Sequence, residues 1–143
     1  MSAPLRVLLP VDGSDASLRA VDHAIDLFRR GLAIELHLLN VQPAVRGAAA
    51  SFVPASDLQD YHREEGKKAL AGAITRVEAA GVAAFEHIGV GDPGPTVCAF
   101  GRKLEVGQVI MGTHGRGGVA EIFLGSVAQH VVSHGKVPVT LVR

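Results

Sequence analysis

Short apolar runs alternate along the chain with stretches whose apolar residues recur at helical spacing. The first run, "LRVLLPV" at Leu5–Val11, precedes the turn sequence "DGS" and predicts a buried strand. Residues Asp15–Arg30 have the apolar periodicity of an amphipathic helix. Ser14 is placed to cap the start of this helix, and Gly31 is placed to end it. The chain is therefore expected to open with a strand, a turn and a helix.

The same alternation continues to the end of the chain. Further strands are expected at Ala33–Val41, Ala84–Val90, Gln108–Met111 and Val137–Val142. Further helices are expected from Ser56 to Gly81, from Pro95 to Val106 and from Ser126 to His134. Small residues and prolines make Gln42–Ala55 aperiodic, which predicts a loop. Near-continuous apolar strands that alternate with helices are typical of a parallel sheet covered on both faces, so we predict one doubly wound α/β domain over residues 1–143.

Composition and charge narrow the possible functions. The chain has 143 residues, of which 48% are hydrophobic, and a formal net charge of zero. This charge balance argues against a general nucleic-acid binder. The single cysteine, Cys98, forms no intrachain disulfide, and no apolar run suggests a signal peptide or a membrane span. We therefore expect a cytoplasmic protein with no nucleic-acid or membrane partner.

Glycines gather where the predicted fourth strand gives way to the last helix. The spacing is G-x2-G-x9-G followed by a hydroxyl residue, at Gly112, Gly115, Gly125 and Ser126. Glycine lets backbone N–H groups turn toward a ligand, and the first-turn N–H groups of Ser126 and Val127 favour an anion. The Ser126 hydroxyl and the Arg116 charge add to this preference. Because ligands of open α/β sheets bind beyond the carboxyl ends of the strands, the segment predicts a phosphate cradle. A flexible loop with a serine N-cap is the alternative.

Three segments of the chain, in the right order, resemble the universal stress protein family. The segment "MGTHGRGGVAEIFLGSVAQHVVSHGKVPVTLVR" at residues 111–143 is similar to the C-terminal signature of the nucleotide-binding members. The segment "VLLPVDGSDASLRAVDHAIDL" at residues 7–27 resembles the family's opening strand, turn and helix. The segment "GVGDPGPTVCAF" at residues 89–100 resembles its third strand-to-helix turn. The likeness covers nearly the whole chain.

The resemblance implies a five-stranded parallel sheet of order 3-2-1-4-5, in the three-layer sandwich of adenine-nucleotide hydrolase-like and flavodoxin-like folds. It implies a homodimer paired through the last strand, Val137–Val142, and ATP with Mg²⁺ at the strand ends. We expect no catalytic residue, and we expect Mg²⁺ to be held by the nucleotide phosphates and Asp12. Carried over by position, the nucleotide-binding residues are Pro10, Val11, Asp12, Val41, Gly91, Met111, Gly112, Gly115, Arg116, Gly125, Ser126 and Val127.

Several of these residues also have an ordinary structural interpretation. Asp12 can accept from ribose hydroxyls or join a magnesium shell, but it is also a usual turn residue in "DGS". Val41 and Met111 are equally expected as strand-end core residues.

Two other motifs are weaker candidates for a site. The segment Gly89–Gly94 has the form G-x-G-x-x-G of a dinucleotide-binding loop, but such a site also requires a carboxylate at the end of the next strand, and none is present there. The pair His130 and His134 lacks a third metal ligand.

We therefore expect an ATP-binding protein that acts in stress response or signalling as a nucleotide-dependent homodimeric switch. An additional protein partner, not identified by the sequence, is compatible with this role. Two alternatives stay open: a dimeric interaction module that binds no nucleotide, and a slow ATPase. The glycine segment supplies Arg116 but no lysine and no clear base, which favours binding over efficient phosphoryl transfer.

Overall fold

The computed structural model describes residues 3–47, 51–113 and 125–143. Its strands form one parallel sheet of order β3-β2-β1-β4-β5, which confirms the predicted topology. The strands are β1 (Leu5–Pro10), β2 (Ile34–Gln42), β3 (Ala84–Val90), β4 (Gln108–Gly112) and β5 (Val139–Val142). The helices are α1 (Asp15–Arg29), α3 (Ala55–Ala80), α4 (Pro93–Lys103) and α5 (Ser126–His134).

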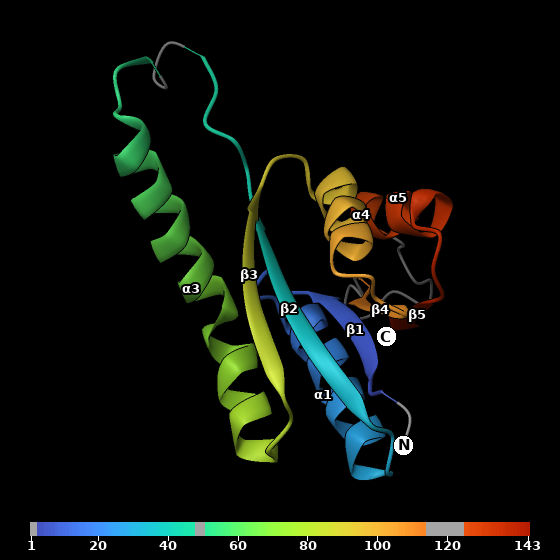
Figure 1. Cartoon of the computed structure of the whole chain (residues 1–143). Helices are drawn as coiled ribbons and strands as arrows, with labels where there is room; N and C mark the ends of the chain where they lie inside the picture. Colours follow the sequence, from blue (N-terminus) through green and yellow to red (C-terminus); the bar gives the residue numbers. More distant parts are fainter. Residues whose placement is uncertain (1–2, 48–50, 114–124) are drawn as a thin grey trace, which may run out of the picture.

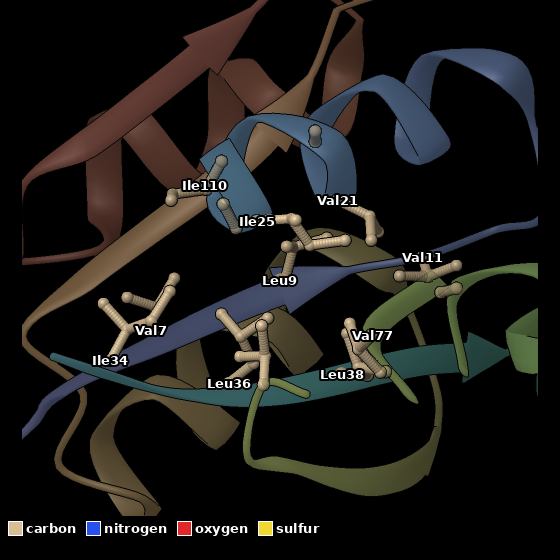
Figure 2. Close-up of a cluster of buried hydrophobic side chains, with 14 of the residues drawn as sticks. Val7, Leu9, Val11, Val21, Ile25, Ile34, Leu36, Leu38, Val77 and Ile110 are labelled. Carbon is tan, nitrogen blue, oxygen red and sulfur yellow. The ribbon is translucent and has the colours of Figure 1, made fainter. Parts of the chain in front are cut away.

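The helices cover both faces of the sheet, with α1 and α3 on one face and α4 and α5 on the other (Figure 1). Successive side chains of β1 point alternately to these two faces. Val7 and Leu9 belong to the cluster under α1 and α3, which Figure 2 shows in close-up, whereas Leu8 belongs to the cluster under α4 and α5. Fully burying one such side chain stabilises the fold by about 1.5–3 kcal/mol, so the apolar strand runs hold the three layers together.

The ends of α1 and α3 follow the sequence signals. Ser14 precedes α1, and its side-chain oxygen accepts a hydrogen bond of 3.2 Å from the Ser17 N–H. Gly31, with a φ of 101°, follows the last residues of α1, and Gly81, with a φ of 72°, follows α3. These left-handed conformations favour glycine and turn the chain back toward the next strand.

The bounds of α4 differ from the prediction at both ends. The helix begins at Pro93 rather than Pro95, because Asp92 adopts an extended N-cap conformation and Pro93 needs no N–H at the first helical position. It ends at Lys103 rather than Val106. Glu105 turns the chain with a φ of 52°, and the Val106 N–H donates to the Gly101 carbonyl oxygen at 3.1 Å.

The last strand is also shorter than predicted. It begins at Val139 rather than Val137, because Pro138 has no N–H and Val137 donates to the Gly135 carbonyl oxygen in a turn. No helix in the described part of the chain combines the length and the apolar composition that a membrane span needs.

Strands β1 and β4 part before their carboxyl ends. β1 pairs with β2 over its whole length, from Leu5 to Pro10, but with β4 only at Val7 and Leu8. Pro10 has no N–H to donate to either neighbour. The order of the strands also reverses here, since β2 and β3 lie on one side of β1 while β4 and β5 lie on the other. Such a switch point is where open α/β sheets leave a crevice.

Candidate functional site

A hollow of ≈ 160 Å³ lies at the carboxyl ends of β1, β2 and β4. We call it the strand-end crevice. Its wall is completed by residues at the start of α1, α4 and α5. The predicted site residues that line it are Pro10, Val11, Asp12, Val41, Met111, Gly112, Gly125 and Val127. Residues far apart in the sequence are thus brought together at the switch point of the sheet.

The inner wall of the crevice is apolar. Leu39 and Val97 are 0% and 1% exposed, and Met111 is 5% exposed. These residues belong to the cluster under α4 and α5, against which Val41 and Val127 pack. Val41 and Met111 therefore pack in the core and line the crevice at once, so the two interpretations of these residues are compatible. A wall of this kind suits a flat, largely apolar ring.

Three helices begin at the crevice. Ser17 in the first turn of α1, Pro93 at the start of α4 and Val127 in the first turn of α5 all line it. The positive ends of the three helix dipoles favour an anion here. The first-turn N–H groups of α5 add to this preference, whereas the Ser17 N–H of α1 already donates to Ser14 Oγ and Pro93 and Pro95 of α4 have no N–H. The N-cap of α5 is Gly125, which supplies no side-chain hydrogen bond to the helix. Ser126 is exposed and is not among the residues that line the crevice.

Asp12 stands at the mouth of the crevice in the turn between β1 and α1. Its Oδ1 accepts a hydrogen bond of 2.9 Å from the Ser14 N–H, so the turn interpretation of this residue is realised. The helix cap itself is supplied by Ser14 and not by Asp12. The turn holds the Asp12 carboxylate beside the crevice, where a ligand role is compatible with it.

The glycines of the predicted site do different things. A Cβ on Gly112 would lie 2.2 Å from the carbonyl oxygen of Ala16, so this glycine lets the first turn of α1 approach β4. Gly91 does not line the crevice; its φ of 143° favours glycine, and its N–H donates to the Gln42 carbonyl oxygen at 2.9 Å. Gly115 and Arg116, predicted to face phosphates, lie outside the described residues.

Asn40 is a crevice residue that the sequence analysis missed. It is 4% exposed, and its Nδ2 donates to the carbonyl oxygen of Val11 at 2.8 Å. Its Oδ1 accepts from Gln42 Nε2 at 2.6 Å. The available signal was a single amide inside the apolar run "AIELHLLNV", since a buried polar side chain requires a partner.

A second polar cluster lies between β2, β3 and α4. His37 Nδ1 and His87 Nε2 share a hydrogen bond of 2.9 Å, and His37 Nε2 donates to Glu35 Oε2 at 2.8 Å. Burial, followed by the neighbouring charges of His37 and Lys103, lowers the pKa of His87. In α5, His134 Nδ1 donates to the His130 carbonyl oxygen at 3.0 Å. Within the described ranges, no three His, Cys, Asp or Glu side chains come together as a metal site.

Comparisons with known proteins find similar sequences and similar folds over nearly the whole chain. The model of the universal stress protein family matches residues 5–143. Universal stress protein MJ0531 of Methanocaldococcus jannaschii is 33% identical over 141 residues, covering 96% of this chain and 81% of that protein. The structure of universal stress protein UspA from Lactobacillus plantarum superposes with a TM-score of 0.77 at 25% identity, covering 99% of this chain and 100% of the other. A universal stress protein in complex with cAMP superposes with a TM-score of 0.66 at 26% identity, covering 99% and 98% of the two chains.

Proposed function

Because the chain belongs to the universal stress protein family, we propose that it binds ATP in the strand-end crevice. We further propose that it acts in stress response or signalling as a nucleotide-dependent homodimeric switch. The observation that carries the proposal is the crevice itself, where an apolar wall meets the N-termini of three helices. The complex of a similar protein with cAMP supports an adenine nucleotide as the ligand class.

We propose a place for each part of the nucleotide from the chemistry of the wall. The apolar side chains of Val41, Met111 and Val97 suit the adenine ring. The start of α5 suits the phosphates, because its first-turn N–H groups and its dipole favour negative charge. Asp12 carries the carboxylate of this wall, so it is the residue suited to ribose hydroxyls or to a Mg²⁺ ion held by the phosphates. Gly115 and Arg116 are proposed to complete the phosphate site.

A calorimetric titration tests the proposal. Protein freed of carried-over nucleotide should bind Mg-ATP with saturation, and competition with AMP and cAMP should rank the adenine nucleotides. Absence of saturable binding at millimolar ATP would contradict the proposal and favour the interaction module without nucleotide.

Gly125→Val is the matched test of the site. Gly125 has φ −61° and ψ 162°, an extended backbone that valine also adopts, so the substitution adds volume at the crevice without backbone strain. The affinity of Gly125→Val for ATP should fall, while its oligomeric state should be that of the wild type. Gly72→Ala is the control, because a Cβ on Gly72 faces Leu18 in the contact between α3 and α1. This control should bind ATP as the wild type does.

The homodimer is proposed to form through β5, within the segment Val137–Val142. β5 is an edge strand that pairs only with β4 among the described residues, and Leu141 on it is 38% exposed. An exposed edge strand is covered when its copy pairs with it about a two-fold axis. Sedimentation equilibrium should show a dimer that Leu141→Asp converts to a monomer. A monomeric wild-type protein would contradict the proposed dimer.

We propose that binding, rather than turnover, is the working state of the protein. The Asp12 carboxylate at the crevice already accepts a hydrogen bond from the Ser14 N–H. This bond suits a carboxylate that contacts the ligand better than one that acts as a general base in catalysis. Phosphate release measured against the Gly125→Val variant, in which ATP binding should fall, tests this point. Release by the wild type far above that of the variant would favour the slow ATPase instead.

A further inference from the structure

A chain of hydrogen bonds joins the carboxyl ends of β3, β2 and β1. The Gly91 N–H donates to the Gln42 carbonyl oxygen at 2.9 Å, and Gln42 Nε2 donates to Asn40 Oδ1 at 2.6 Å. Asn40 Nδ2 then donates to the Val11 carbonyl oxygen at 2.8 Å. This series of bonds reaches the strand-end crevice at Asn40 and Val11, which both line it, and ends at the residue before Asp12.

Asn40 is the central member of this series and the more buried of its two side chains that form hydrogen bonds. It is 4% exposed and follows Leu38 and Leu39, which are both 0% exposed. An amide in such surroundings is destabilising unless both of its ends are hydrogen-bonded. Both ends are bonded here, the oxygen to Gln42 and the nitrogen to the carbonyl oxygen of Val11, which lines the crevice with Asn40. The position of Asn40 is therefore better explained by what it holds than by core packing.

Both backbone polar groups of Val11 are hydrogen-bonded to residues of β2. The Val11 N–H donates to the Leu39 carbonyl oxygen at 2.8 Å, and the Val11 carbonyl oxygen accepts from Asn40. The next residue, Asp12, turns its Oδ1 to the Ser14 N–H at 2.9 Å. The Asp12 carboxylate thus follows directly on a residue whose N–H and carbonyl oxygen are both bonded to β2.

We propose that Asn40 is a positioning residue for nucleotide recognition at this crevice, acting through the Val11–Asp12 peptide. It holds the Asp12 carboxylate where a ribose hydroxyl meets it, so the preference for ribonucleotides over 2′-deoxyribonucleotides depends on Asn40. Gln42 supports Asn40 by bonding its oxygen. This inference rests on the proposed ATP binding, and its test separates the two.

The test compares Mg-ATP with Mg–2′-deoxy-ATP by calorimetry in the wild type and in Asn40→Leu. Leucine is close to asparagine in shape and suits the apolar strand, but it cannot donate to Val11. ATP affinity should fall about tenfold, which corresponds to a lost buried hydrogen bond. The affinity for 2′-deoxy-ATP should fall much less, so that the ratio of ATP affinity to 2′-deoxy-ATP affinity moves toward one.

Two further variants keep the outcome interpretable. Gln42→Leu removes the bond to Asn40 Oδ1 at a half-buried position and should lower the ratio in the same direction, by less. If Asn40→Leu does not fold, the Gln42→Leu variant tests the positioning role of Asn40 in its place. Gln108→Leu is the matched control, because Gln108 is also half-buried in a strand and donates to Thr140 Oγ1 at the other end of the sheet. It should leave the ratio unchanged.

The outcomes separate the inference from the proposed function. A wild type that binds no ATP contradicts the proposed function. A wild type that binds both nucleotides equally, or an Asn40→Leu variant that loses affinity for both by the same factor, overturns the inference and leaves ATP binding in place. The inference is supported if the ratio of ATP affinity to 2′-deoxy-ATP affinity moves toward one in Asn40→Leu and stays at the wild-type value in Gln108→Leu.

Discussion

Replacing Gly112 with alanine tests how closely the first turn of α1 packs on the end of β4. The added Cβ would lie 2.2 Å from the Ala16 carbonyl oxygen, 2.5 Å from the Ala16 carbonyl carbon and 3.1 Å from the Ser17 nitrogen. All three are backbone atoms, so no side-chain rotation relieves the overlap. A shift of roughly 1 Å between helix and strand is required, and overpacking of this kind costs about 1–3 kcal/mol.

Gly72→Ala is the matched comparison. Gly72 lies within α3, and a Cβ there would be 3.4 Å from Leu18 Cδ2, an ordinary contact distance. Alanine in a helix interior is about 0.5–1 kcal/mol more stable than glycine. The two Gly→Ala changes should therefore alter the free energy of unfolding in opposite directions, with a difference of about 3 kcal/mol.

Urea denaturation followed by far-ultraviolet circular dichroism, without nucleotide, measures this difference. With a slope of about 1–3 kcal/mol per molar urea, Gly112→Ala should unfold at a midpoint lower by about 1 M. A Gly112→Ala protein as stable as the wild type would refute the packing argument. If such a protein also bound ATP poorly, Gly112 would serve the ligand alone.

Three smaller effects follow from single residues. Ser14→Ala removes the cap of α1 and should lower stability by about 1 kcal/mol, or about 3 °C in Tm; an unchanged Tm would contradict the cap. Glu105→Gly relieves a left-handed φ of 52° and should raise stability by about 1 kcal/mol in urea denaturation, where a decrease would show that the Glu105 side chain matters more. An NMR titration should place the pKa of His87 below its ordinary 6.5, because burial and the His37 and Lys103 charges disfavour the protonated ring. As the pH falls through 6.5, His87 is protonated in the unfolded chain before it is protonated in the folded protein, so the free energy of unfolding should decrease toward the folded-state pKa. A measured pKa at or above 6.5 would contradict this prediction.

The alternation of strands and helices and the ends of α1 and α3 were predictable because local chemistry dictates them, whereas the strand order was implied by the resemblance to the universal stress protein family. Apolar runs such as "LRVLLPV" can be buried only between two layers of helices, and Gly31 and Gly81 occupy the left-handed positions that end helices. The start of α4 was predicted wrongly because Pro93 and Pro95 both suit a first helical turn. The extended conformation of Asp92, which decides between them, depends on how the chain leaves β3 and cannot be derived from local preference.

The position of the crevice was predictable from glycine spacing, but the roles of individual residues were not. The contact that makes Gly112 necessary joins it to Ala16, and the bond that explains Asn40 joins it to Val11. Each pair is distant in the sequence and adjacent only after β1, β2 and β4 are aligned in the sheet. Sequence patterns indicate where such residues lie, and the register of the strands decides what they touch.

The central claim is that an adenine nucleotide binds where β1 and β4 part. The most direct measurement is the movement of backbone amide NMR signals as Mg-ATP is added to nucleotide-free protein. Saturating shifts are expected at Val41, Met111 and Val127, which line the crevice. No shifts are expected at Gly31 and Gly81, which precede the amino ends of β2 and β3, opposite the crevice. Signals that do not move at millimolar ATP, or saturating shifts centred away from the crevice, would contradict the claim.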